Sequence, residues 1–257
     1  MKFVKMEGLG NDFVVFEGPL APTAAEIAAW CDRRRGIGAD GVLVATRLDS
    51  DRVRMEYWNA DGGRAEMCGN GLRCVARFAH DRGWTDGRSF TVETDLGDHA
   101  VKVKHSGRVR ALLGRVEAPE HAVMSVVGTD VHPMGMGNPH AVLFVENTTE
   151  APVKTLGPVI EVAEQFPDRT NVEFVEVKDR TRIEVRTWER GVGETLACGT
   201  GAGAAAVVAN REGLADGAIT VGLLGGDLDV EIDGETVWME GPASYVFEGQ
   251  LPRAEPA

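Results

Sequence analysis

The 257-residue chain has few basic residues, few cysteines and no long apolar run, and each shortage excludes a class of function. It carries 27 Lys and Arg against 40 Asp and Glu, a formal net charge of -13. Proteins that hold nucleic acid through its phosphates need clustered positive charge, so nucleic acid is not an expected partner. No stretch approaches the ~18 apolar residues of a membrane span, and the first residues lack the apolar core of a signal peptide. The composition predicts a cytoplasmic protein with no membrane partner.

The four cysteines, Cys31, Cys68, Cys74 and Cys198, are too few and too scattered for a disulfide framework in a chain of this size. Reduced thiols are therefore expected. Zinc sites use ligand pairs at short spacing, and the separation of Cys68 from Cys74 fits such a pair poorly. No metal is predicted.

What the chain does contain is an internal repeat. RVRMEYWNAD (52–61) leads into MCGNG, and RIEVRTWERG (182–191) leads into ACGTG, so that Cys68 and Cys198 align at an offset of 130. Both leading segments alternate apolar and polar residues, as half-buried strands do. Each cysteine thus follows a predicted strand.

The repeat continues on both sides of the cysteines. A helical stretch follows each cysteine and stops at a glycine, Gly83 or Gly213, where a helix end favours a residue tolerant of the left-handed conformation. A second motif, Gly-x-Gly-Asn, occurs in GLGND (8–12) and GMGNP (135–139). Two motifs in the same order at nearly the same offset indicate duplication of one α/β unit.

The expected domains are residues 1–116 and 117–245, and the chain end, 246–257, can pack on either half. Helices are expected at 24–35, opened by a capping box of Thr23 and Glu26, and at 155–166. Strands are expected near residues 2–7, 13–17, 41–47, 52–58, 89–94, 99–104, 108–116, 140–146, 171–177, 182–188, 218–223, 228–232, 236–240 and 245–249. The fold class is α+β, with two pseudo-symmetric domains of mostly antiparallel strands.

The position of Cys68 and Cys198 suits acid–base chemistry. Free N–H groups and the dipole at a helix start favour a thiolate and lower its pKa. If the two halves face each other, the two thiols can reach one carbon from opposite sides. A single cysteine is more often a small buried apolar residue, and we interpret Cys31 and Cys74 in that way. The duplicated context favours the functional interpretation for the other two.

The chain resembles the diaminopimelate epimerase family. The resemblance implies a cofactor-independent enzyme that interconverts LL- and meso-diaminopimelate, commonly a homodimer, with a central helix in each domain and the active site in the cleft between the domains. No lysine stands in a recognisable site for pyridoxal phosphate. The matching blocks are KMEGLGNDFVV (5–15), GIGADGVLV (36–44), NADGGRAEMCGNGLRC (59–74), GNPHAV (137–142), RTNVEFV (169–175) and ERGVGETLACGTGAGAAAV (189–207).

The resemblance also implies site residues. Cys68 and Cys198 match the catalytic pair, one a thiolate base and the other a thiol acid. His140 and Glu189 match groups that tune the thiol pKa. Where some family members carry a polar side chain, this chain has Gly41, so a contact there would come from backbone or water. The substrate-binding positions implied are Asn11, Asn59, Gly69, Asn70, Asn138, Asn171, Glu189, Arg190, Gly199 and Thr200.

These residue types suit a zwitterionic amino acid. An asparagine amide both donates and accepts hydrogen bonds, and an arginine offers a planar fork to a carboxylate. Taken alone, Asn11 and Asn138 would be turn residues, and His140 a structural histidine. Asp12 and Glu66 are interpreted as structural or supporting groups.

Three alternatives stay open from the sequence. A proline racemase or hydroxyproline epimerase would share the cysteine pair but lack the GLGNDF and ERGxGET blocks. The phenazine-biosynthesis isomerases share the architecture without the paired cysteines. A non-enzymatic thiol redox sensor would form a disulfide between Cys68 and Cys74.

Overall fold

The computed structural model describes residues 1–116 and 123–252. The chain divides into two compact units, residues 1–111 with the chain end from Pro242, and residues 112–241. The residues 117–122 lie outside the described part, and the predicted boundary between 116 and 117 stays a prediction. No helix within the described ranges is long and apolar enough to cross a bilayer.

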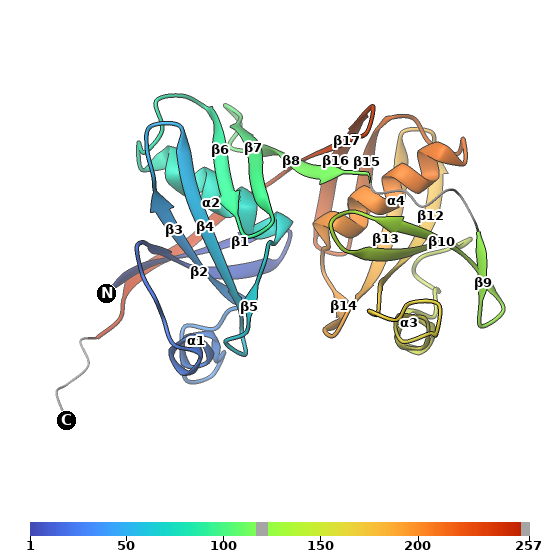
Figure 1. The fold of residues 1–257 in the computed structure, drawn as a ribbon, viewed down its shortest axis with the longest axis horizontal. Coiled ribbons are helices and arrows are strands. Elements are labelled where there is room, and N and C mark those ends of the chain that lie inside the picture. The colour runs from blue at the N-terminus through green and yellow to red at the C-terminus, as the bar shows by residue number, and fades with distance from the viewer. Residues whose placement is uncertain (117–122, 253–257) are drawn as a thin grey trace. The chain divides into compact units, whose positions relative to one another are not determined.

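Unit 1 is a mixed sheet with two helices (Figure 1). Its strands join in the order β18-β1-β2-β3-β4-β6-β7-β8, with β5 beside β4, and only residues 109–111 of β8 belong to this unit. All pairs are antiparallel except β2 with β3 and β4 with β6. The elements are β1 (Lys2–Gly8), β2 (Asn11–Glu17), α1 (Ala24–Cys31), β3 (Gly41–Arg47), β4 (Arg52–Asn59), β5 (Arg64–Ala65), α2 (Gly69–Asp81), β6 (Ser89–Thr94), β7 (Gly97–Val103), β8 (Val109–Arg115) and β18 (Ser244–Gln250).

Unit 2 repeats this topology except at the edge, where β9, which precedes β10 in the chain, takes the place that β18 has beside β1. Its order is β9-β10-β11-β12-β13-β15-β16-β17, with β14 beside β13, and the two parallel pairs recur as β11 with β12 and β13 with β15. The predicted fold class of two similar α+β units is confirmed. The elements are β9 (Met124–Val126), β10 (Thr129–Gly135), β11 (Pro139–Phe144), α3 (Val153–Glu161), β12 (Asn171–Asp179), β13 (Arg182–Glu189), β14 (Gly193–Thr195), α4 (Gly199–Arg211), β15 (Ala218–Leu223), β16 (Gly226–Asp233) and β17 (Thr236–Gly241).

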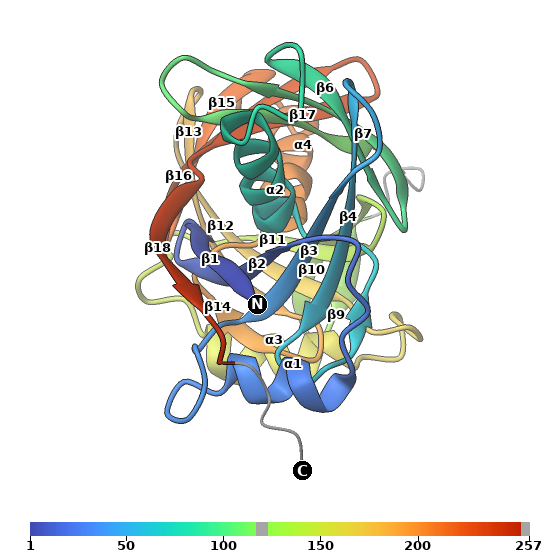
Figure 2. The same cartoon turned by 90° about the vertical axis from the view of Figure 1, so that its left-hand side faces the viewer.

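Each unit is wrapped around one buried helix. Helix α2 packs against β1, β2, β3, β4, β6 and β7, and α4 packs against β10 to β13 and β15 to β17; Figure 2 shows the strands of unit 1 around α2. Alanines and glycines make up much of α4, which lets the strands approach it closely. Both helices end as expected at left-handed glycines, Gly83 with φ 67° and Gly213 with φ 72°.

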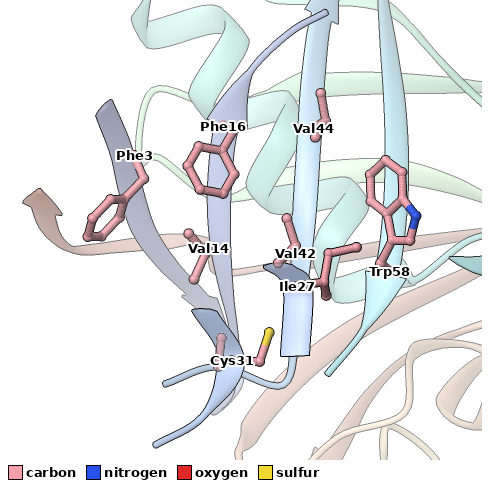
Figure 3. Close-up of a cluster of buried hydrophobic side chains, with 9 residues drawn as sticks. Phe3, Val14, Phe16, Ile27, Cys31, Val42, Val44 and Trp58 are labelled. Atoms are coloured by element: carbon pink, nitrogen blue, oxygen red, sulfur yellow. The ribbon is translucent and has the colours of Figure 1, made fainter. Parts of the chain in front are cut away.

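A second, smaller core lies between α1 and the sheet of unit 1. Figure 3 shows Ile27 and Cys31 of α1 against aromatic and β-branched side chains of β1 to β4. The predicted capping box is present, because Thr23 accepts from the Glu26 backbone while the Glu26 carboxylate accepts from Thr23. Burying the face of α1 offsets the marginal stability of so short a helix.

Two element predictions are wrong. Helix α1 ends at Cys31 rather than at residue 35, because Asp32 adopts an extended conformation and its carboxylate accepts from the amides of Arg34 and Arg35. The other helix, α3, spans Val153–Glu161 instead of 155–166.

Strand β10 was missed by the sequence analysis. Pro133 interrupts its pattern, and proline cannot donate to a sheet. The strand forms all the same, since β10 pairs with β11 and takes the place that β1 has in unit 1. The short strands β5, β9 and β14 were missed as well.

Candidate active site

Both repeated cysteines are the N-cap residues of the two buried helices. Cys68 caps α2 and its sulfur accepts from the Gly71 amide at 3.5 Å, while Cys198 caps α4 and accepts from Gly201 at 3.4 Å. Both have the extended backbone that an N-cap requires. The position predicted for the two thiols, at a helix start, is confirmed.

In unit 1 the thiol of Cys68 contacts a chain of two asparagines. Asn11 Oδ1 accepts from Cys68 Sγ at 3.6 Å and from Asn70 Nδ2 at 3.3 Å. The Asn11 Nδ2 group donates in the opposite direction, to Asp40 Oδ2 at 2.8 Å. Because a carboxylate only accepts, Asp40 fixes which end of the Asn11 amide faces Cys68.

An ion-pair network holds Asp40, which in turn accepts from Asn11. Arg33 donates to Asp12 and to Asp40, and the buried Lys5 contacts Asp12 at 2.7 Å. Burial alone would raise the pKa of the Asp12 carboxyl, but hydrogen bonds from Arg33 and Lys5 lower it to about 2. Asp12 therefore stays ionised as part of the support of Asn11.

Asn59 ends β4 and is held by a residue that the sequence analysis missed. The Tyr57 hydroxyl donates to Asn59 Oδ1 at 2.8 Å. A side chain at Gly41 would begin only 2.5 Å from Trp58 O and 2.6 Å from Tyr57 Cε2. The Tyr57 ring thus occupies the space next to Gly41, and its place two residues before Asn59 was the signal available in the sequence.

In unit 2 a chain of side chains leads away from Cys198. Its sulfur lies 3.5 Å from Thr200 Oγ1, which accepts from Asn138 Nδ2 at 3.4 Å. Asn138 Oδ1 lies 2.8 Å from His140 Nε2. The structure therefore brings together four residues that the sequence predicted separately.

The row of hydrogen-bonded side chains that begins at Cys198 ends at Glu173 of β12, a residue that the sequence did not single out. Glu173 Oε1 lies 2.8 Å from His140 Nδ1, and both side chains are fully buried. Within the described ranges, Glu173 Oε2 has no hydrogen-bond partner. The sequence signal was a charged residue inside the apolar strand NVEFV.

The turn after β13 presents Glu189 and Arg190. Asn171 ties it to β11, because Asn171 Oδ1 accepts from the Arg190 amide at 2.9 Å and Asn171 Nδ2 donates to Pro139 O at 3.0 Å. The Glu189 carboxylate accepts from the hydroxyl of Thr195 on β14. The turn is thus held by hydrogen bonds to Asn171, and the Glu189 carboxylate by Thr195.

Burial raises the pKa of Cys198 well above its ordinary value, and the negative charges of Glu189 and Glu173 add to this effect, against donors at Thr200 and Gly201. The expectation that the helix start lowers this pKa is wrong, because desolvation outweighs the dipole. Burial likewise raises the pKa of Cys31 to about 11 and that of Cys74 further. Both are buried, as interpreted, and within the described residues all four cysteines are thiols outside any disulfide.

The described residues contain no cluster of three or more His, Cys, Asp or Glu placed to hold a metal ion. The backbone N–H groups at the starts of α2 and α4, next to the two thiols, are suited to a small polar anion.

Comparison with known proteins identifies close relatives. The family model described as diaminopimelate epimerase matches residues 3–118 and 133–246. A diaminopimelate epimerase from Moorella thermoacetica is 42% identical over 278 residues, 98% of this chain and 99% of that protein. One from Alkalilimnicola ehrlichii is 44% identical over 274 residues, 98% of each chain.

Solved structures share the fold at low identity. A phenazine biosynthesis protein of the PhzF family from Bacillus anthracis matches with TM-score 0.75 and 16% identity, covering 98% of this chain and 99% of its own. A hydroxyproline epimerase from Agrobacterium vitis matches with TM-score 0.70 and 13% identity, covering 100% of this chain and 93% of its own. At these identities the likeness concerns the fold alone.

Proposed function

We propose that this chain, which belongs to the diaminopimelate epimerase family, interconverts LL- and meso-diaminopimelate by proton transfer through Cys68 and Cys198. The observation that carries the proposal is the equivalence of the two thiols. Each caps the buried helix of its own unit, at the same point of the same topology. Each unit supplies one of the two proton-transfer groups that inversion of a carbon centre requires.

The steps balance without a redox partner. One cysteine, as thiolate, takes the α-hydrogen as a proton and becomes a thiol, and the C–H electron pair stays on the substrate as a carbanion. The other cysteine, as thiol, gives its proton to the opposite face of that carbon and becomes the thiolate. The reverse reaction exchanges the two roles.

The carbanion is the difficult species, because an amino-acid Cα–H is a very weak acid. Donors fixed before the reaction stabilise the developing charge on the carboxylate. The amides of Gly69, Asn70, Gly199 and Thr200 stand in the first turns of α2 and α4, and we assign them to the substrate α-carboxylate. No organic cofactor is part of this proposal.

The polar side chains divide between the remaining groups of the substrate. We assign Arg190 to a carboxylate and Glu189 to an ammonium group, because their charges are complementary. Asn11, Asn59, Asn138 and Asn171 supply amides that both donate and accept. His140 and Glu189 tune the protonation of the cysteines.

The sequence alternatives receive less support. The hydroxyproline epimerase shares 13% of its residues with this chain, against 42% and 44% for diaminopimelate epimerases over a comparable coverage. A redox sensor would use Cys74, which is fully buried and whose pKa burial raises far above its ordinary value. A thiol in that setting is a poor partner for disulfide exchange.

The direct test is isotope incorporation. The protein is incubated in D2O with LL-diaminopimelate or, separately, with L-proline, and α-deuteration and inversion are followed by NMR and chiral chromatography. Deuterium should enter only diaminopimelate, with inversion. Cys68→Ala and Cys198→Ala should each lose at least about a hundredfold in epimerisation, the scale of a general acid–base group.

Cys74→Ala is the matched control, since Cys74 lies on α2 with Cys68. It should keep activity within a few-fold. Near-full activity in either Cys68→Ala or Cys198→Ala would contradict the two-cysteine mechanism, and exchange on proline would redirect the substrate assignment.

We further propose that the protein works as a homodimer in the cytoplasm, where thiols stay reduced. The support is β18, whose only partner among the described strands is β1. It exposes three successive large apolar side chains, Tyr245, Val246 and Phe247. Exposed apolar edge strands are sites of chain association.

Light scattering after size-exclusion chromatography tests the dimer. Val246→Asp should give a monomer, because it places a charge in the buried strand contact. Leu48→Asp changes an equally exposed apolar residue elsewhere and should leave the dimer intact. A monomeric unmodified protein would exclude the assignment.

A further inference from the structure

The two units differ at the residues behind their cysteines. In the parallel pairs, Phe13 of β2 aligns with Gly41 of β3, and His140 of β11 aligns with Asn171 of β12. Phe13 and His140 are therefore equivalent.

The same register makes Leu43 of β3 equivalent to Glu173 of β12. The close approaches agree, since a Cβ at Gly71 would meet Leu43 while a Cβ at Gly201 would meet Glu173. The apolar pair Phe13 and Leu43, in the unit of Cys68, therefore takes the place of the ionisable pair His140 and Glu173 in the unit of Cys198.

The two equivalent asparagines are turned in opposite directions. Asn11 presents its carbonyl oxygen to Asn70 and Cys68, because its NH2 group donates to Asp40. Asn138 presents its NH2 group to Thr200, because its oxygen faces His140 Nε2.

The orientation of Asn138 is linked to the hydrogens of the His140 ring. Glu173 Oε1 and Asn138 Oδ1 each lie 2.8 Å from one ring nitrogen, and both oxygens can accept from the ring only if both nitrogens carry hydrogen. A reversed Asn138 amide would require a neutral ring. The fully buried Glu173 charge would then be uncompensated, which is costly in a protein interior.

We propose that Glu173 is a positioning residue that, through His140 and Asn138, makes the Thr200 hydroxyl donate its hydrogen to the sulfur of Cys198. Thr200 already accepts from Asn138, and among the described residues Cys198 Sγ is the other atom that its hydroxyl contacts. Cys198 is thereby supported as a thiolate. Cys68, whose S–H faces the Asn11 oxygen, is supported as a thiol.

This arrangement works against the other charges around Cys198. The titratable groups that face it are His140 on β11, Glu173 on β12 and Glu189 on β13, and both carboxylates raise the thiol pKa in addition to burial. The Thr200 hydroxyl and the Gly201 amide are the donors that favour the thiolate. In the proposed arrangement the Thr200 hydroxyl is one of these two donors, and its hydrogen bond to sulfur is charge-assisted when Cys198 is a thiolate.

The inference rests on the proposed role of Cys198, but its test needs no substrate. In a Cys68→Ala background, the alkylation of Cys198 by iodoacetamide is followed by peptide mapping at fixed pH, because the rate follows the thiolate fraction. Glu173→Gln should lower the rate about tenfold, on the scale of one hydrogen bond to a charged group. A purely electrostatic effect of Glu173 predicts the opposite, since removal of a negative charge favours the thiolate.

Two variants complete the test. Thr200→Val should lower the rate as much as Glu173→Gln, and the double variant should lower it no further, because both break one chain. Thr200→Ser keeps the hydroxyl and should react at nearly the parent rate. An unchanged or faster rate in Glu173→Gln would overturn the proposal.

The nitrogen NMR shifts of the His140 ring give a second measurement on the unmodified protein. Both ring nitrogens should be protonated at neutral pH, and a singly protonated ring would overturn the proposal even if a variant failed to fold. If the alkylation rates are as expected but the unmodified protein shows no epimerase activity, the proposed function is contradicted rather than this inference.

Discussion

Arg73 Nη2 donates to Asn70 Oδ1 over 2.7 Å within helix α2, and the Arg73 side chain is completely buried. The same guanidinium donates to Gly69 O and to Pro242 O, so it joins the first turn of α2 to the chain end. Burial lowers the pKa of Arg73 to about 10, which leaves it charged at neutral pH. The residue that follows the cysteine motif thus holds that motif in place.

Replacement of Arg73 by methionine should destabilise the fold. It removes the Arg73 donor from the Asn70 oxygen and from the carbonyls of Gly69 and Pro242, and we expect a loss of about 3 kcal/mol. Arg73→Lys retains one donor and should lose less. Urea unfolding followed by circular dichroism measures both, and equal stability of Arg73→Met and the parent would contradict the assigned role.

The two equivalent helix glycines provide a matched pair. Gly201→Ala would place a Cβ 2.6 Å from Glu173 Oε1, whereas Gly71→Ala meets the flexible Leu43 side chain at 3.0 Å. Gly201→Ala should destabilise by about 1–3 kcal/mol, the usual cost of overpacking. Gly71→Ala should be nearly neutral, since alanine favours the helix by ~1 kcal/mol. Thermal unfolding of both variants gives the comparison, and the reverse order would contradict it.

Tyr57→Phe removes the hydroxyl that donates to Asn59 and keeps the aromatic ring. The ring still fills the space beside Gly41, so stability should change by less than about 1 kcal/mol. The KM for diaminopimelate should rise several-fold, because Asn59 is no longer fixed for binding. Steady-state kinetics measure this rise. Phe16→Leu, a change in the core of the same unit, is the control, and it should lower stability and leave KM unchanged.

Acid stability should depend on Asp12. Its pKa is about 2 in the folded protein against 3.8 for an aspartate in the unfolded chain, so the folded state favours the carboxylate and binds fewer protons than the unfolded state. The stabilisation is complete above about pH 5 and is lost as the pH falls toward 2. Because Asp12 is partly accessible, we expect this stabilisation to amount to only about 1–2 kcal/mol.

Asp12→Asn should therefore flatten the dependence of unfolding free energy on pH between about 5 and 2. Denaturant titrations at several pH values measure the slope. Asp130→Asn, at an exposed position of β10, should leave the slope unchanged. The same slope in Asp12→Asn and the parent would show that Asp12 does not titrate as assigned.

Much of the fold was readable from the sequence because the relevant signals are local. The alternation in RVRMEYWNAD and RIEVRTWERG specifies β4 and β13, and Thr23 with Glu26 starts α1. The offset of 130 between Cys68 and Cys198 predicted the duplication. Strand β10 was not readable, because its Pro133 opposes a strand locally and only its pairing with β11 makes one.

The supporting groups of the site were decided by tertiary structure. Asp40 and Glu173 reach the predicted residues from a neighbouring part of the sheet, 29 and 33 positions away along the chain, and no local spacing encodes such contacts. The pKa of Cys198 is a further case, since a helix start predicts a lowered value and the burial that raises it exists only in the folded chain.

The sequence by itself determined the repeat, the two helix-capping cysteines and the family, because these depend on residue order alone. The tertiary structure decided what stands behind each thiol, an apolar pair with Phe13 and Leu43 or an ionisable pair with His140 and Glu173. The physical reason is that strand pairing places residues about thirty positions apart, such as His140 and Glu173, within one hydrogen bond of each other. Duplication made the two sites alike, and these buried neighbours made them chemically different.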